Sequence, residues 1–257
     1  MSSVLFEINN GIAIITLNRP DKYNAFNREM AMAVQSNLDA CKADDVRVVI
    51  ITGAGKAFCS GQDLTEAIDP TGPGMKLILK EHYNPIVEKI RALEKPVIAA
   101  VNGVAAGAGA NIALCADLTI ATKSSSFIQA FSKIGLIPDS GGSYFLPRLI
   151  GLQRATALMM LGEKVDADQA AALGMIYKSV EDDQFKNAVN ELAVTLAAMP
   201  TKALGLIKQE LNHSFSNSLT AQLELEDALQ QKAASTQDFI EGVMAFIQKR
   251  KPTFKGK

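Results

Sequence analysis

Two apolar runs, "VRVVIITG" (46–53) and "PVIAAVNG" (96–103), most constrain what this chain can fold into. Runs that are continuously apolar and rich in β-branched residues are typical of strands buried on both faces, as in a parallel sheet covered by helices. Helical spacing precedes the first run, because Met30, Val34, Leu38 and Cys41 would share one face of a helix capped by Asn27. We therefore expect an α/β fold.

The rest of the chain sets the order of elements around these strands. The start, "VLFEINNGIAIITL", predicts a hairpin that turns at "NNG", and the chain beyond Gly151 is almost entirely helical in pattern. Pro85 interrupts a helical pattern and should kink or divide that helix. We expect a core over residues 1–195 and a helical C-terminal region over 196–257.

Charge and cysteine content exclude several classes of function. The net charge of -1 gives no basic field for nucleic acid or an anionic membrane. No apolar stretch approaches the roughly 20 residues of a membrane span, and no signal peptide is apparent. Cys41, Cys59 and Cys115 form no CxxC pair, so reduced thiols in a cytoplasmic protein are expected.

Four familiar motifs fail on inspection. "TGAGK" lacks the spacing of a phosphate-binding P-loop, and "GVAAGAGA" does not give a dinucleotide fingerprint. His82 and His213 belong to no metal-ligand motif, so we expect no metal site and a surface or packing role for each. A Ser-His-Asp triad is discounted because no GxSxG elbow is present.

Two glycine-rich segments, "AFCSGQDL" and "NGVAAGAGAN", each follow one of the buried strands. Glycine and alanine let the backbone approach a ligand closely, and the second segment leads into a predicted helix whose first N–H groups are free. Two N–H groups that converge from two loops would form an oxyanion hole. Taken singly, each segment is as well explained by tight packing in an ordinary glycine-rich loop.

Asp139 stands in "FSKIGLIPDSGGSYFLPRLIG" with two possible roles. It follows a proline and precedes a helical pattern, which is typical of an N-cap. Alternatively, Ile134, Leu136, Ile137 and Pro138 would surround it with apolar groups, raise its pKa and make it a better base.

Several segments in the same order resemble the enoyl-CoA hydratase/isomerase, or crotonase, superfamily over essentially the whole chain. They include "ITLNRPDKYNAFN", "VVIITGAGKAFCSGQDL", "KPVIAAVNGVAAGAGANIALCADLTIAT", "GLIPDSGG" and "EGVMAFIQKRKPTFKG". The resemblance implies a spiral of ββα units with a helical C-terminal trimerisation region. It also implies a homotrimer or dimer of trimers that binds acyl-CoA thioesters and uses no cofactor apart from the coenzyme A of its substrate.

Motif positions in the resemblance assign the site. The N–H groups of Gln62 and Ala108, which follow Gly61 and Gly107, would form the oxyanion hole. The resemblance implies that Gly61 and Gly107 themselves also contact the substrate. Further positions are implied to bind coenzyme A or the acyl group; they are Lys56, Ala57, Phe58, Asp63 and Leu64 for the adenine and phosphate end, and Asn111 and Phe131 for the acyl pocket. An ordinary exposed loop lysine explains Lys56 equally well. Tyr83 is expected only to pack on its helix.

Asn111 and Phe131 occupy the positions of the two glutamates with which hydratases of this superfamily add water. Asp139 matches an aspartate that acts on the substrate in several isomerases and a dehalogenase of the superfamily. The chain is most similar to the isomerases of phenylacetate degradation, so we expect it to convert ring-1,2-epoxyphenylacetyl-CoA to oxepin-CoA or to shift enoyl-CoA double bonds, with Asp139 as acid and base. The alternatives are a β-oxidation hydratase and a non-catalytic acyl-CoA-binding or structural subunit.

Overall fold

The computed structural model describes residues 2–257. Its chain begins with the predicted hairpin, in which β1 (Val4–Asn9) pairs antiparallel with β2 (Ile12–Leu17). Asn10 and Gly11 form the turn with φ values of 51° and 79°, which asparagine and glycine tolerate best.

The hairpin opens a six-stranded sheet with the order β1-β2-β3-β5-β7-β10. All pairs from β2 onward are parallel, and the two apolar runs supply β3 and β5 at its centre. The bounds of its remaining strands are β3 (Val48–Gly53), β5 (Val97–Val101), β7 (Leu118–Thr122) and β10 (Lys178–Val180). The expected α/β class is confirmed.

A second sheet of four strands, ordered β4-β6-β8-β9, lies beyond the carboxyl ends of the first. Each of β3, β5 and β7 continues into one of its strands and then into a helix, which produces a spiral of ββα units. Successive turns stack closely, because a Cβ added to Gly103 would lie 2.1 Å from the carbonyl oxygen of Lys56. The bounds are β4 (Ala57–Cys59), β6 (Val104–Ala106), β8 (Ser126–Ile128) and β9 (Lys164–Asp166), with helices α2 (Leu64–Ala67), α5 (Ala108–Cys115) and η3 (Ala130–Ile134).

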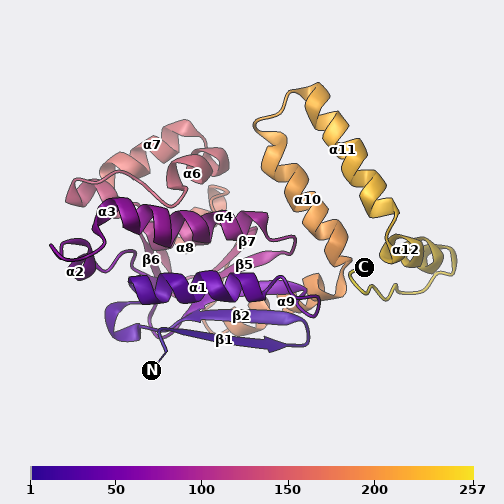
Figure 1. Ribbon diagram of the computed structural model, residues 1–257, viewed down its shortest axis with the longest axis horizontal. Coiled ribbons are helices and arrows are strands. Elements are labelled where there is room, and N and C mark those ends of the chain that lie inside the picture. The colour runs from indigo at the N-terminus through magenta and orange to yellow at the C-terminus, as the bar shows by residue number, and fades with distance from the viewer. Residues whose placement is uncertain (1) are drawn as a thin grey trace.

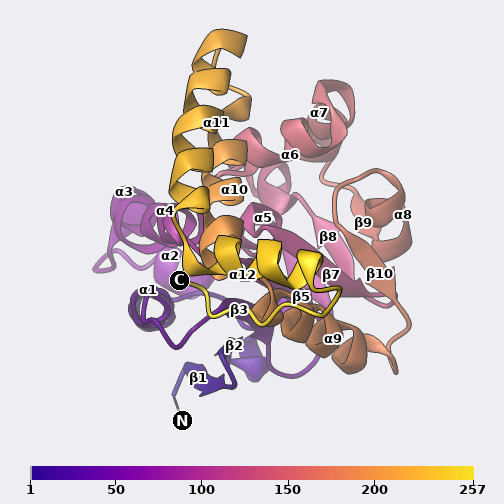
Figure 2. The same cartoon turned by 90° about the vertical axis from the view of Figure 1, so that its right-hand side faces the viewer.

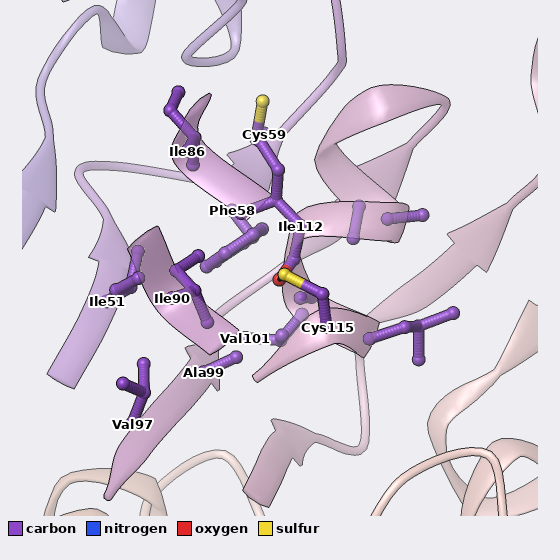
Figure 3. Packing of buried hydrophobic residues seen from close by; sticks show 14 of the residues in the cluster. Ile51, Phe58, Cys59, Ile86, Ile90, Val97, Ala99, Val101, Ile112 and Cys115 are labelled. Atoms are coloured by element: carbon purple, nitrogen blue, oxygen red, sulfur yellow. Dashed lines mark hydrogen bonds between the residues drawn. The ribbon is translucent and has the colours of Figure 1, made fainter. Parts of the chain in front are cut away.

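Helices α1 (Arg28–Ala40), α4 (Asn84–Ala92) and α5 cover one face of the large sheet and enclose the main core. The side chain of Asn27 accepts a hydrogen bond from the Met30 N–H at 3.0 Å, so the predicted cap of α1 is present. Figure 3 shows Ile86, Ile90 and Ile112 from these helices lying near strand residues such as Val101.

The other face of the sheet is covered by α9 (Phe185–Ala198), whose Val189 and Ala193 pack with Ile50 and Ile98. The boundary expected after residue 195 falls inside this helix, so the part that leaves the core begins later. That part comprises α10 (Thr201–Ser214), α11 (Leu219–Ala234) and α12 (Gln237–Ile247). It projects from one side of the molecule in Figure 1, and in the turned view of Figure 2 α11 reaches beyond the other elements.

Pro85 interrupts the regular α-helix, as predicted, and the interruption takes the form of a π-helical turn. The helix runs through α3 (Gly74–Leu77), the π turn η2 (Ile78–Tyr83) and α4. Pro85 has no N–H for the carbonyl four residues earlier, that of Glu81. The Gln35 amide on α1 donates to this carbonyl at 2.7 Å instead, so the widened turn is anchored to its neighbour.

The remaining short elements complete the chain between the strands. They are η1 (Pro20–Lys22), α6 (Gly142–Ile150), α7 (Leu152–Leu161) and α8 (Ala167–Ala172). Among residues 2–257, no helix has the length and apolar character that crossing a bilayer requires.

Candidate active site

The two glycine-rich loops meet at the ends of β4 and β6. A Cβ added to Gly61 would lie 3.0 Å from the Ala106 carbonyl oxygen and 3.5 Å from the Ala108 nitrogen, so the two backbones are in contact. Gly61 and Gly107 have φ values of 98° and 53°, in a region that L side chains rarely adopt. Glycine suits both positions because of the positive φ, and at Gly61 the chain must in addition approach another backbone.

The N–H groups that follow these glycines are free. In the part of the chain that the structure describes, neither the Gln62 N–H nor the Ala108 N–H has a hydrogen-bond acceptor. Ala108 opens α5, where the helix dipole adds partial positive charge. The loops therefore bring two unpaired donors together at one place, which is the arrangement that an anionic oxygen requires.

The side chain of Gln62 is held at both ends of its amide. Its Nε2 donates to Glu66 Oε2 at 2.8 Å, and its Oε1 accepts a hydrogen bond from the Tyr83 hydroxyl, also at 2.8 Å. Tyr83 is buried at the end of η2. The expectation of simple packing was incomplete, because the Tyr83 hydroxyl also donates a hydrogen bond to the side chain of Gln62, whose N–H is one of the two free donors.

Asp139 lies in the loop between η3 and α6, half-buried, with its Oδ1 accepting a hydrogen bond from Ser140 Oγ at 2.8 Å. Burial raises the pKa of the Asp139 carboxyl above its ordinary value, and the Ser140 hydrogen bond opposes that shift. The N-cap alternative is wrong: α6 begins at Gly142, its cap is Gly141, and no side chain caps it.

The apolar residues beside Asp139 in sequence are exposed in the single chain: Ile137 is 81 % exposed, and Ile134 and Leu136 are also exposed. The raised pKa expected for Asp139 is present, with burial as its cause. Burial also raises the pKa of the Tyr83 phenol, and the charge of the Asp139 carboxyl adds to that shift.

Asn111 holds the loop that carries Asp139 through a hydrogen bond to its main chain. It is fully buried on α5, where its Nδ2 donates to the Asp139 carbonyl at 2.8 Å and its Oδ1 accepts from Gln129 Nε2 at 2.7 Å. A Cβ on Gly142 would lie 2.2 Å from the Asn111 amide nitrogen, so the contact is close. Asn111 was expected to line the acyl pocket. In this structure its side chain is fully buried and instead holds the main chain of the candidate base, Asp139.

Phe131, the other residue expected at the acyl pocket, is buried in η3. Its ring Cζ would lie 3.8 Å from a Cβ on Gly107. It thus lies beside the second N–H loop, although it has no group that exchanges protons.

The residues expected to bind coenzyme A differ in exposure. Lys56 is exposed, whereas the side chains of Ala57 and Phe58 are buried in the core, which leaves only their backbone for a ligand. The Asp63 carboxylate pairs with Arg19 at 2.9 Å and also caps α2. Leu64 is exposed at the first position of α2.

The histidines take different places. His213 is exposed on α10, and His82 is buried on η2, where burial lowers its pKa. Within residues 2–257, no group of three or more His, Cys, Asp or Glu side chains is placed to hold a metal ion.

Comparison with known proteins decides the family. The sequence profile of the enoyl-CoA hydratase/isomerase family matches residues 7–257. The chain belongs to this family. It is 46% identical to the 1,2-epoxyphenylacetyl-CoA isomerase of Escherichia coli (strain K12), covering 100% of both chains. It is 42% identical to a probable enoyl-CoA hydratase of Rhodobacter capsulatus, with 99% of this chain and 98% of the relative covered.

Solved structures of the enoyl-CoA hydratase/isomerase family agree with this membership. The enoyl-CoA hydratase of Bacillus anthracis superposes with a TM-score of 0.92 at 31% identity, over 99% of this chain and 100% of that one. The predicted crotonase fold, a spiral of ββα units with C-terminal helices, is thereby confirmed. Family membership makes the chain an enzyme of acyl-CoA thioesters, and the relatives include both isomerases and hydratases.

Proposed function

We propose that this protein is an acyl-CoA isomerase in which Asp139 moves a proton between two carbons of the substrate. The Gln62 and Ala108 N–H groups would hold the thioester oxygen and stabilise the enolate formed when Asp139 removes the proton. Asp139 would then return the same proton to a different carbon, so the substrate is isomerised with no change of formula. This transfer needs one carboxyl group and two fixed donors, and no metal or redox cofactor takes part.

The observation that carries this proposal is the pairing of two free N–H groups with a single candidate base. Asn111 is fully engaged with Asp139 and Gln129, and Phe131 cannot exchange a proton. Burial raises the pKa of the Asp139 carboxyl above its ordinary value, which makes its carboxylate a stronger base.

For the substrate, we propose ring-1,2-epoxyphenylacetyl-CoA, converted to oxepin-CoA, together with enoyl-CoA esters whose double bond is shifted. The full-length similarity to the Escherichia coli isomerase supports this choice. The second candidate is an enoyl-CoA hydratase, supported by the name of the Rhodobacter relative. Hydration needs a second group to activate water, which Asn111 and Phe131 do not supply.

We further propose that the protein assembles as a homotrimer, or a dimer of trimers, through α10–α12. Large apolar side chains are exposed along these helices in the single chain, and a partner surface would cover them. We place the enzyme in the cytoplasm, where its three free cysteines would stay reduced.

The test uses purified protein, 3-hexenoyl-CoA and 2-hexenoyl-CoA in oxygen-18 water, with products separated by chromatography and then weighed by mass spectrometry. We expect a shifted double bond without added mass, and a loss of about 10²- to 10⁴-fold in kcat for Asp139→Asn, the usual worth of a general acid–base. Asp183→Asn, which changes an exposed aspartate in the same way, should retain activity.

Incorporation of labelled water would instead make the protein a hydratase. Near-normal turnover by Asp139→Asn would remove Asp139 from the mechanism. Binding of both esters without turnover would support a non-catalytic acyl-CoA-binding subunit.

A further inference from the structure

We propose that Tyr83 is a positioning residue of the oxyanion hole: it holds the Gln62 side chain so that the Gln62 N–H keeps its direction toward the thioester oxygen. This inference rests on the proposed function and adds a residue from a separate helix to the site. It assigns a role to the Tyr83 hydroxyl, which the packing of the ring does not require.

The backbone on either side of Gln62 explains why its N–H is free. The Phe26 N–H donates to the Gly61 carbonyl at 2.7 Å, and the Asp63 N–H donates to the Phe26 carbonyl at 2.8 Å. Because backbone groups alternate in direction along an extended chain, the N–H of Gln62 between them points away from Phe26. The two hydrogen bonds to Phe26 form a β-bridge that fixes one edge of residues 61–63 and leaves the other edge to the ligand.

The bridge orients the donor, because the Gln62 N–H belongs to the same planar peptide group as the Gly61 carbonyl that Phe26 holds. Gly61 itself, with a φ of 98° and no side chain, adds little restraint of its own on this peptide group. A second restraint comes from the Gln62 amide, which is held by Tyr83 on one side and Glu66 on the other. Glu66 is in turn fixed by the Arg28 N–H at 2.9 Å, so both ends of the amide are tied to helices.

Tyr83 is a rigid support for this contact. Its ring is buried and lies 5.7 Å from the Phe26 ring, at an interplanar angle of 58°. The phenol therefore packs on the same residue that bridges the loop. Burial and the nearby acidic groups raise its pKa, so the hydroxyl remains a hydrogen-bond donor to Gln62 at all working pH values.

A double-mutant cycle tests the inference. Tyr83→Phe removes one oxygen and keeps the ring, while Gln62→Met keeps the backbone N–H and removes the amide. With 3-hexenoyl-CoA, we expect each single variant to lower kcat about 10-fold with little change in KM, as for loss of one hydrogen bond that matters in the transition state. The double variant should be no slower than the singles, since both break the same contact. Tyr177→Phe, an exposed tyrosine, is the matched control.

A second readout needs no turnover. The infrared band of the thioester carbonyl, labelled with carbon-13 in 3-hexenoyl-CoA, falls in frequency when N–H groups polarise it. In Tyr83→Phe and in Gln62→Met, we expect the carbonyl band of the bound ester to lie at a higher frequency than in the wild type. A cooperative thermal unfolding transition in each variant would show that both still fold.

Three results would overturn the positioning role: an unchanged kcat and carbonyl band in Tyr83→Phe, a rise in KM alone, or losses that multiply in the double variant. The proposed function fails separately, by activity in Asp139→Asn or by hydration in the wild type. In the latter case the same cycle applies to the hydration rate, and where no turnover occurs the carbonyl band decides.

Discussion

The loops of the candidate site and the C-terminal helices differ in whether their side chains find partners within the chain. Around Asp139, the buried side chains of Asn111, Gln129 and Ser140 each make a hydrogen bond within the chain, although Gln129 Oε1 has no partner among the described residues. Along α11 and α12, apolar side chains lack such partners, with Leu219 76% and Phe246 86% exposed. Under the proposals made above, one chain would hold the whole chemical centre, whereas the apolar side chains of α11 and α12 would be covered by a partner surface.

If this comparison holds, substitutions in the two regions have separable effects. Changes near the loops should alter stability or proton transfer without changing assembly. Changes on α12 should alter assembly while leaving the fold of the single chain intact.

The largest effect is expected for Gly109→Ala in the site region. The new Cβ would lie 2.3 Å from the Cys59 carbonyl oxygen, so α5 must move away from β4. Overpacking of this kind costs about 3 kcal/mol or more of the free energy of unfolding, measured by urea denaturation. Gly135→Ala, where nothing lies within 4 Å of the new Cβ, should lose only the roughly 1 kcal/mol cost of a positive φ. Equal stability of the two variants would show that the loops are not tightly stacked.

An intermediate effect is expected for Phe246→Glu on α12. The side chain is 86% exposed in the single chain, so the monomer should fold normally. Burying a phenylalanine at an interface contributes about 2 kcal/mol, and the variant loses this at each contact and adds a charge. Light scattering should show smaller species at micromolar concentration. An unchanged oligomer mass would mean that this face is not the interface, and the comparison would need another explanation for its exposed side chains.

The smallest effect is expected for Ser140→Ala, and it sharpens the role of Asp139. The Ser140 hydroxyl stabilises the carboxylate, so its loss raises the Asp139 pKa further. Because the base must be ionised, the acidic limb of the kcat/KM profile should move to higher pH by roughly one unit, the worth of one hydrogen bond to a charge.

Ser140→Gly is the control for backbone strain in this loop, because Ser140 has a φ of 51° that glycine adopts freely. The same shift in both variants would assign it to the hydroxyl. A limb that stays in place in both would show that another group sets the pH dependence.

How far the sequence predicts this protein depends on the range of the interactions involved. The buried strands, the hairpin and the two glycine loops follow from local patterns, since periodicity and positive φ depend on neighbouring residues. The start of α6 was placed wrongly because Ser140 and Gly141 adopt positive φ and delay the helix. The tasks of Tyr83 and Asn111 depend on contacts across 21 and 28 residues of sequence, which no local pattern records.

The π turn before Pro85 has a consequence for the register of the site. A π turn holds more residues per turn than an α-helix, which advances about 100° per residue. Deleting one residue from 78–82 would restore the ordinary ladder and rotate α3 by about 100° relative to Tyr83 and α4, which follow the deletion and would keep their places. The smallest unit of change at this position is therefore an insertion or deletion rather than a substitution. A relative that lacks the extra residue would present a different face of α3 to its surroundings.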